Sequence, residues 1–220
     1  MKTLHTICTA VGVMSVVVGL GWAPPGFSAE LTLMNDSFSG SGSVFCVSGQ
    51  SFAETEMAAA RFTADAGSYP FQVLRVQVLA CPAGTQADLV LKIWEDDGVS
   101  DEPGDLLYEE FFTLLGSASA LNELDVSFQD ITVTSGSIRV GIQYFFGPAL
   151  TGLATDLDGH VEPQPNYIYA LPPDGWTPAH FFGVNGDWII RVVVDANEQP
   201  PVFEDDFESG DTSAWSDVVP

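Results

Sequence analysis

Apolar and polar residues alternate with a period of two along most of this chain, and no sustained helical stripe interrupts the alternation. A period of two places every second side chain on one face of a β-strand, whereas a helix repeats its apolar face every three or four residues. The clearest runs are FQVLRVQVLAC, ADLVLKIWED, ELDVSFQDITVT, SIRVGIQYFF and GDWIIRVVVD. The pattern predicts an all-β protein.

The same alternation predicts which side chains face a core. The expected inward residues are Leu74, Val76, Val78 and Ala80; Leu89, Leu91 and Ile93; Leu124, Val126 and Phe128; and Ile138, Val140, Ile142 and Tyr144. Turn sequences such as DDGVSDEPGD, TSGS and PPDGW separate the runs, because Gly supplies positive φ and Pro fixes φ. About nine short strands of this kind suit an antiparallel β-sandwich, jelly-roll-like, in which each sheet buries one apolar side.

One stretch, AETEMAAARF at residues 53–62, is compatible with a helix. Its alanines favour a helix, while its strand-like neighbours favour a strand. Both interpretations stay open from the sequence.

Residues 1–28 are predicted to form a secretory signal peptide. Lys2 supplies the positive start, and the apolar stretch over residues 7–20 is shorter than a membrane span. Small residues at Gly26 and Ser28 favour cleavage after Ser28, with cleavage after Ala29 or an uncleaved anchor as alternatives. We therefore expect a β-sandwich domain at 29–196, a linker at 197–202 and a tail at 203–220.

Without Cys8, which lies in the signal, two cysteines remain, Cys46 and Cys81. In an exported protein such a pair is most simply a disulfide bond. Closing a loop of about 36 residues would stabilise the fold by about 4 kcal/mol in the chain-entropy model. Metal ligation would need more Cys or His residues than His160 and His180 provide at these spacings.

The formal net charge is −24, with six Lys and Arg residues against thirty Asp and Glu. Nucleic acid is excluded as a partner, because binding phosphates requires basic patches. The net negative charge also argues against binding to an anionic membrane surface. The acidity could serve calcium binding or simply a well-solvated surface.

No catalytic residues are expected. The adjacent Glu109 and Glu110 would point to opposite sides of a sheet, so this pair cannot flank one sugar. Convergence of Glu95 with Glu109 or Glu123 stays open. The chain has no G-x-S-x-G sequence and no Gly-rich phosphate loop between a strand and a helix.

Two acidic loops are candidates for calcium, the one cofactor that the sequence leaves possible. Calcium takes six to eight oxygen ligands, and neither loop has the EF-hand spacing. The alternative is that Asp and Gly form turns there by bonding their own backbone. The candidate ligands are Asp96, Asp97, Asp101, Asp156 and Asp158.

Aromatic residues are the remaining candidates for ligand binding. Trp94, Trp176 and Trp188 could stack on a sugar, and Tyr167 and Tyr169 alternate onto one face of their strand. Trp176 follows the turn PPDG and is the one most expected to be exposed. A packing role is the alternative, because large aromatic rings dominate core energetics.

The segments LVLKIWEDDGVSDEPGDLLYEE, IRVGIQY, ATDLDG, YIYALPPDGW and GVNGDWIIRVVV follow one another between residues 58 and 195. In this order they resemble a β-sandwich module that recurs in large secreted bacterial proteins. The resemblance implies an accessory, non-catalytic module and transfers no established binding residues.

The C-terminal residues form a second pattern, after the polar boundary DANEQPP. They resemble the signature F-x-x-x-F-E-x-G-D-x-S-x-W-S, found at the end of many exported proteins of Gram-negative bacteria. The resemblance implies a sorting tag read by export machinery; the alternative is a further strand of the sandwich. The matching residues are Phe203, Phe207, Glu208, Gly210, Asp211, Ser213, Trp215 and Ser216.

These observations favour a secreted, non-enzymatic β-sandwich protein that acts by binding or display at the surface of a Gram-negative bacterium or outside the cell. The expected partners are the export or sorting machinery and a surface glycan or protein, and no membrane span is expected in the mature chain. The alternative is a carbohydrate-active protein, either a calcium-assisted glycan-binding module or a glycoside hydrolase.

Overall fold

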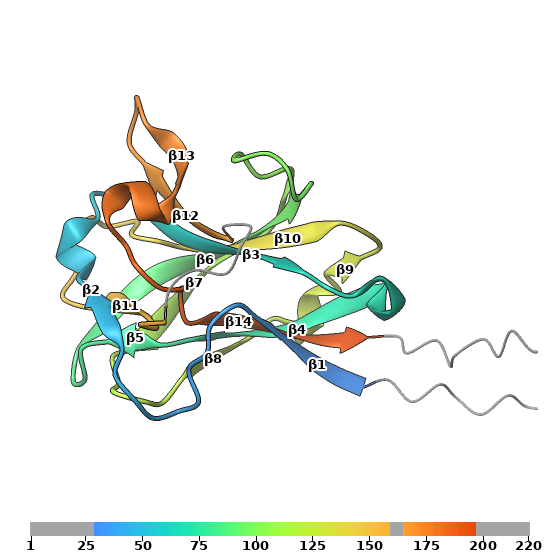
Figure 1. Ribbon diagram of the computed structural model, residues 1–220, viewed down its shortest axis with the longest axis horizontal. Helices are drawn as coiled ribbons and strands as arrows, with labels where there is room; N and C mark the ends of the chain where they lie inside the picture. The colour runs from blue at the N-terminus through green and yellow to red at the C-terminus, as the bar shows by residue number, and fades with distance from the viewer. Residues whose placement is uncertain (1–28, 159–164, 197–220) are drawn as a thin grey trace, which may run out of the picture.

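The computed structural model describes residues 29–158 and 165–196, which form two stacked antiparallel sheets with a small third sheet at one end (Figure 1). The β4 sheet contains β1 (Ala29–Met34), β14 (Ile190–Ala196), β4 (Phe71–Val78), β8 (Asn122–Asp125) and β9 (Thr132–Val133). The β10 sheet has the order β13 (Gly175–Pro178), β12 (Asn166–Ala170), β3 (Met57–Thr63), β10 (Ser137–Gln143), β6 (Gln86–Asp96) and β7 (Leu106–Leu115). The small sheet contains β2 (Phe45–Val47), β11 (Gly152–Thr155) and β5 (Ala80–Cys81).

Four short 3₁₀ helices connect the strands of the described residues: η1 (Gly49–Ser51), η2 (Ala66–Ser68), η3 (Ser127–Gln129) and η4 (Ala179–Phe182). The predicted antiparallel β-sandwich is therefore confirmed. The described residues contain fourteen strands rather than about nine, because several are pieces of two to four residues that alternation cannot detect.

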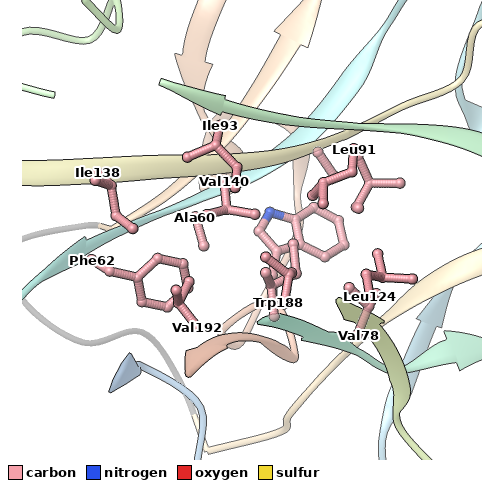
Figure 2. Close-up of a cluster of buried hydrophobic side chains, with 14 of the residues drawn as sticks. Ala60, Phe62, Val78, Leu91, Ile93, Leu124, Ile138, Val140, Trp188 and Val192 are labelled. Atoms are coloured by element: carbon pink, nitrogen blue, oxygen red, sulfur yellow. The ribbon is translucent and has the colours of Figure 1, made fainter. Parts of the chain in front are cut away.

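The core fills the space between the two large sheets. Leu91 and Val140 of the β10 sheet face Leu124 of the β4 sheet, and the indole of Trp188 lies between the layers (Figure 2). Trp188 is fully buried. The predicted inward rows of β6 and β10 are confirmed, since every one of their members is buried.

Residues 57–63 form a strand, which decides between the two interpretations of AETEMAAARF. β3 is paired on both edges, with β10 and with β12. Ala58 and Ala60 have no exposed surface and face the core. Backbone pairing on both sides and burial of the alanine methyl groups outweigh the helix propensity of alanine.

Two predicted inward residues are wrong. The ladder between β14 and β4 shifts register at Val193 and Val194, so that Val73 rather than Leu74 is buried in the core. A β-bulge of this kind moves the following residues to the other face. Phe128 is 66% exposed, because β8 ends at Asp125 and the chain turns into η3.

The predicted signal peptide, linker and tail, together with His160, lie outside the described residues. Among the described residues, no helix is long and apolar enough to cross a membrane.

Candidate binding site

A cavity of about 540 Å³ opens at one end of the sandwich, lined by residues of the β2–η1 segment and of β12 and η4. Figure 1 shows these segments at the same end of the molecule. This volume lies within the range of about 300–1,000 Å³ that is typical of small-molecule sites. Its walls carry both apolar and polar groups. The lining includes the phenyl rings of Phe45, Phe52 and Phe182 and the polar groups of Ser48, Ser51 and Glu56.

A disulfide bond holds one wall of the cavity. Cys46 in β2 is bonded to Cys81 in β5, 35 residues further along the chain, so the predicted pairing is confirmed. Both strands also pair with β11, which lies between them. Cys46 itself lines the cavity beside Phe45, so the covalent bond fixes the strand that carries this ring.

The η1 segment forms a second wall, and a close backbone contact keeps it in place. A Cβ atom on Gly49 would lie 2.1 Å from the carbonyl oxygen of Thr151, so only glycine fits there. Phe52 follows η1 and stacks on Tyr144, with ring centroids 4.4 Å apart and an interplanar angle of 5°. The ring of Phe52 is therefore held in place by packing against a core residue.

Glu56 supplies the charge of the cavity. One carboxylate oxygen accepts the N–H of Ala53 at 2.8 Å, and the other accepts the N–H of Leu171 at 3.1 Å. Each oxygen keeps capacity for a further hydrogen bond, since a carboxylate has about four acceptor sites. Among the described residues that line the cavity, Glu56 is the only one with an ionisable side chain.

Exposed apolar side chains surround this end of the molecule. Phe145 and Phe146 are exposed as well, but their ring centroids lie 5.3 Å and 5.7 Å from that of Phe111 in β7, and they do not line the cavity. Leu171 is bonded to Glu56. We call the following exposed residues the aromatic rim: Phe45, Leu171, Phe181 and Phe182. Exposed apolar side chains beside a cavity are typical of interaction sites.

A different cluster lies on the outer face of the β10 sheet, around Asp96. The Asp96 carboxylate has no exposed surface and contacts Arg139 at 2.6 Å and Arg61 at 2.7 Å. The Arg139 guanidinium lies 3.9 Å from the ring centroid of Tyr167 and 5.1 Å from that of Trp176. Burial lowers the pKa of Arg139, while the nearby Asp96 favours its charged form.

The two arginines also hold the acidic loop that follows β6. Arg139 donates to the carbonyl oxygens of Ser100 and Asp101, and Arg61 donates to that of Gly98. Asp97 accepts the N–H groups of Val99 and Ser100, which lowers the pKa of its carboxyl group. At Asp97 the carboxylate thus forms a turn, and at Asp96 two guanidinium groups already supply positive charge.

The second predicted calcium loop is also tied to backbone groups. Asp156 is buried and accepts the N–H of Asp187 at 2.8 Å and that of Ser37 at 2.9 Å. Burial raises the pKa of Asp156, and hydrogen bonds to Ser37 and Asp156 lower that of Asp158. Within residues 29–158 and 165–196, no group of three or more Asp, Glu, His and Cys side chains is placed to hold a metal ion. Calcium at either loop stays a prediction.

The predicted aromatic residues are divided between packing and partial exposure. Tyr167 is buried beneath Arg139, and Trp94 and Trp188 are buried as well. Trp176 is half-buried, with its ring centroid 5.5 Å from that of Trp94 and 5.4 Å from that of Tyr169. None of these rings lines the cavity.

The acidic residues left open in the sequence do not converge. Glu109 in β7 pairs with Lys92 of the β10 sheet at 3.1 Å, whereas Glu123 in β8 pairs with Arg75 of the β4 sheet at 3.2 Å. Glu95 is exposed in β6. Glu123 lies on the β4 sheet, apart from the other two carboxylates. Glu95 and Glu109 lie on neighbouring strands of the β10 sheet, but Glu109 is opposite Lys92 and Glu95 is three residues from Lys92, so the two carboxylates point to opposite faces. Neither pair can therefore flank one sugar.

Sequence reasoning missed Phe45, Phe52, Glu56 and Phe182. The pair of adjacent phenylalanines in PAHFFG was the one available signal, because a short turn segment cannot bury both rings. The other residues lie in short segments without periodicity, and only the fold brings them together.

No protein-family model matches the chain, and no curated protein matches it. Among solved structures, one similar chain contains the cysteine protease and lectin-like domains of Cwp84, a surface-layer-associated protein of Clostridium difficile. The identity is 14% and the TM-score is 0.45, over 66% of this chain and 33% of that chain. The aligned region is thus about a third of that protein's chain. A similarity of this size carries no conclusion about the present chain.

Proposed function

We propose that this protein is an exported, non-enzymatic β-sandwich that binds a ligand through the cavity and its aromatic rim. The observation that carries the proposal is the presence of two exposed phenylalanines, Phe45 and Phe182, in the lining of a cavity of about 540 Å³. Exposing such rings to water is unfavourable unless a ligand or partner covers them.

Two further observations support the proposal. Glu56 is the single carboxylate among the described residues that line the cavity, whereas hydrolysis of a glycosidic bond requires two. The disulfide bond is typical of proteins in oxidising compartments, in agreement with export through residues 1–28.

The test is binding to arrays of immobilised glycans and peptides, with calcium and with chelator. We expect Phe45→Ala and Phe182→Ala to reduce binding about tenfold or more, as expected for aromatic residues at the centre of an interface. The matched control is Phe128→Ala, since Phe128 is also exposed but lies in η3, outside the cavity lining. Equal losses in all three variants would contradict a site at the cavity.

A second candidate function is glycan binding on the outer face of the β10 sheet. The half-buried Trp176 and the neighbouring Tyr169 favour it, because partly exposed rings can stack on a pyranose. Array binding that is lost with Trp176→Ala but kept with Phe182→Ala would favour this face over the cavity. Dependence on calcium would add support for the acidic loop after β6.

A further inference from the structure

The side chains that line the cavity are better suited to one class of ligand than to a neutral sugar. Three phenyl rings form the walls, and none of them carries a hydrogen-bond donor. The hydroxyls of Ser48 and Ser51 are the side-chain donors of the described lining, and the Ser48 hydroxyl also accepts the N–H of Gln50 at 3.2 Å. A sugar needs donors and acceptors for many hydroxyl groups, and the side chains of the described lining offer only two hydroxyls and one carboxylate for them.

The charge of the site points in the same direction. No Lys or Arg lies among the described residues of the lining, and Glu56 places a carboxylate there. The whole chain carries a formal net charge of −24, which raises the local concentration of cations near its surface. Ring faces carry the negative part of the aromatic quadrupole and attract cations.

We propose that the cavity binds an organic ammonium group, either a quaternary ammonium or the amine of an alkyl side chain. The phenyl rings contact the carbon atoms around the nitrogen, and Glu56 neutralises its charge. This inference rests on the proposed function, because it names the ligand class of the same cavity.

The test uses two probes of nearly equal shape, titrated into the full-length exported protein at constant ionic strength and followed by NMR. Choline carries the quaternary ammonium, and 3,3-dimethylbutan-1-ol replaces the charged nitrogen with carbon. We expect choline to bind at least about fivefold more tightly than the neutral probe. An Nα-acetyl-lysine amide forms a third arm: tighter binding than choline assigns a primary amine, and weaker binding assigns a quaternary group.

Two variants separate the ring and charge contributions. Phe182→Leu keeps an apolar side chain but removes the ring, so choline should bind about threefold or more weakly while the neutral probe is unaffected. Glu56→Gln should weaken choline about tenfold. Its matched control is Glu54→Gln, which removes a nearby exposed carboxylate outside the lining and should change choline binding less than about twofold.

Because Glu56 also accepts two backbone hydrogen bonds, thermal melts must show that Glu56→Gln is folded. If Glu56→Gln is not folded, the effect of Phe182→Leu on choline binding alone tests the inference. Equal affinity for choline and its neutral analogue would overturn the ammonium inference and leave the cavity as an apolar site. Failure of both probes, and of every ligand on the arrays, would overturn the proposed function as well.

Discussion

Individual buried charges determine how the acidic loop after β6 is held. Asp96 and Arg139 have no exposed side-chain surface, and Arg61 is only 10% exposed. Removing one partner from such a cluster leaves a charge without compensation in a low-dielectric environment, which costs far more than the pair itself contributes. The loop therefore depends on a carboxylate that the sequence suggested as a metal ligand.

Asp96→Asn should lower the free energy of unfolding by about 3–5 kcal/mol, because two guanidinium groups lose their buried counter-charge. The measurement is urea denaturation followed by tryptophan fluorescence. Asp101→Asn is the matched control, because Arg139 binds the backbone carbonyl of Asp101. That control should change stability by less than about 0.5 kcal/mol. Similar stabilities for the two variants would contradict the assigned role of Asp96.

The hydroxyl of Tyr144 is buried and has no hydrogen-bond partner among the described residues. Burying an unpaired hydroxyl is unfavourable, so Tyr144→Phe should stabilise the protein by about 1 kcal/mol. The hydroxyl of Tyr69 accepts the N–H of Ala64 at 3.3 Å and donates to the carbonyl of Gly136. Tyr69→Phe should therefore destabilise the protein by a similar amount, and loss of stability in both variants would contradict the prediction.

Tyr144 also determines part of the change in stability at alkaline pH. Burial raises the pKa of Tyr144 above its ordinary value of about 10. Above that value the unfolded chain loses this proton while the folded protein keeps it, so stability falls as the pH rises. Tyr144→Phe should make the decline shallower by up to about 1.4 kcal/mol per pH unit. An unchanged slope between pH 10 and 12 would contradict this account.

Among the elements, β2 depends most on a covalent bond. It has only three residues and pairs with β11 alone, while Cys46 joins it to β5. A strand this short gains little from its own hydrogen bonds. The disulfide thus holds Phe45 and its neighbours in place at the cavity.

Replacing both Cys46 and Cys81 with alanine should cost about 4 kcal/mol of stability by the chain-entropy model. In the double variant, we also expect hydrogen exchange to become faster in β2 by a larger factor than in β6, because the cavity wall loses its covalent attachment. Exchange rates measured by mass spectrometry on the oxidised protein and the double variant test both points. Unchanged exchange in β2 would show that pairing with β11 is sufficient.

At the level of elements, the sequence predicted the long strands well. β6 and β10 were predicted with their correct inward faces, because each has a large apolar residue at every second position, such as Leu89, Leu91 and Ile93 in β6. Leu74 failed because a bulge depends on the partner strand, and Phe128 failed because a short 3₁₀ helix ends the alternation. The cavity could not be predicted, because Phe45, Glu56 and Phe182 are far apart in the sequence and only chain folding brings them together.

At the scale of the whole molecule, we expect the described domain to fold without the C-terminal residues. β14 is already paired on both sides, with β1 and with β4. Deleting residues 203–220 should shift the melting temperature by less than about 2 °C, while altering where the protein accumulates in its native host. Trp215→Ala should reproduce the change in sorting. A large drop in melting temperature with unchanged localisation would indicate a strand instead.

The two ends of the described domain lie side by side, since Ala29 is paired with Ala196, at the end of the sandwich away from β2 and η4 (Figure 1). Force applied between these two residues would peel β1 from β14 one residue pair at a time, and a ladder loaded in this way resists little tension. A tether at one terminus puts no load across the ladder. It also leaves the aromatic rim at the far end from the attachment, directed toward whatever the surrounding medium contains.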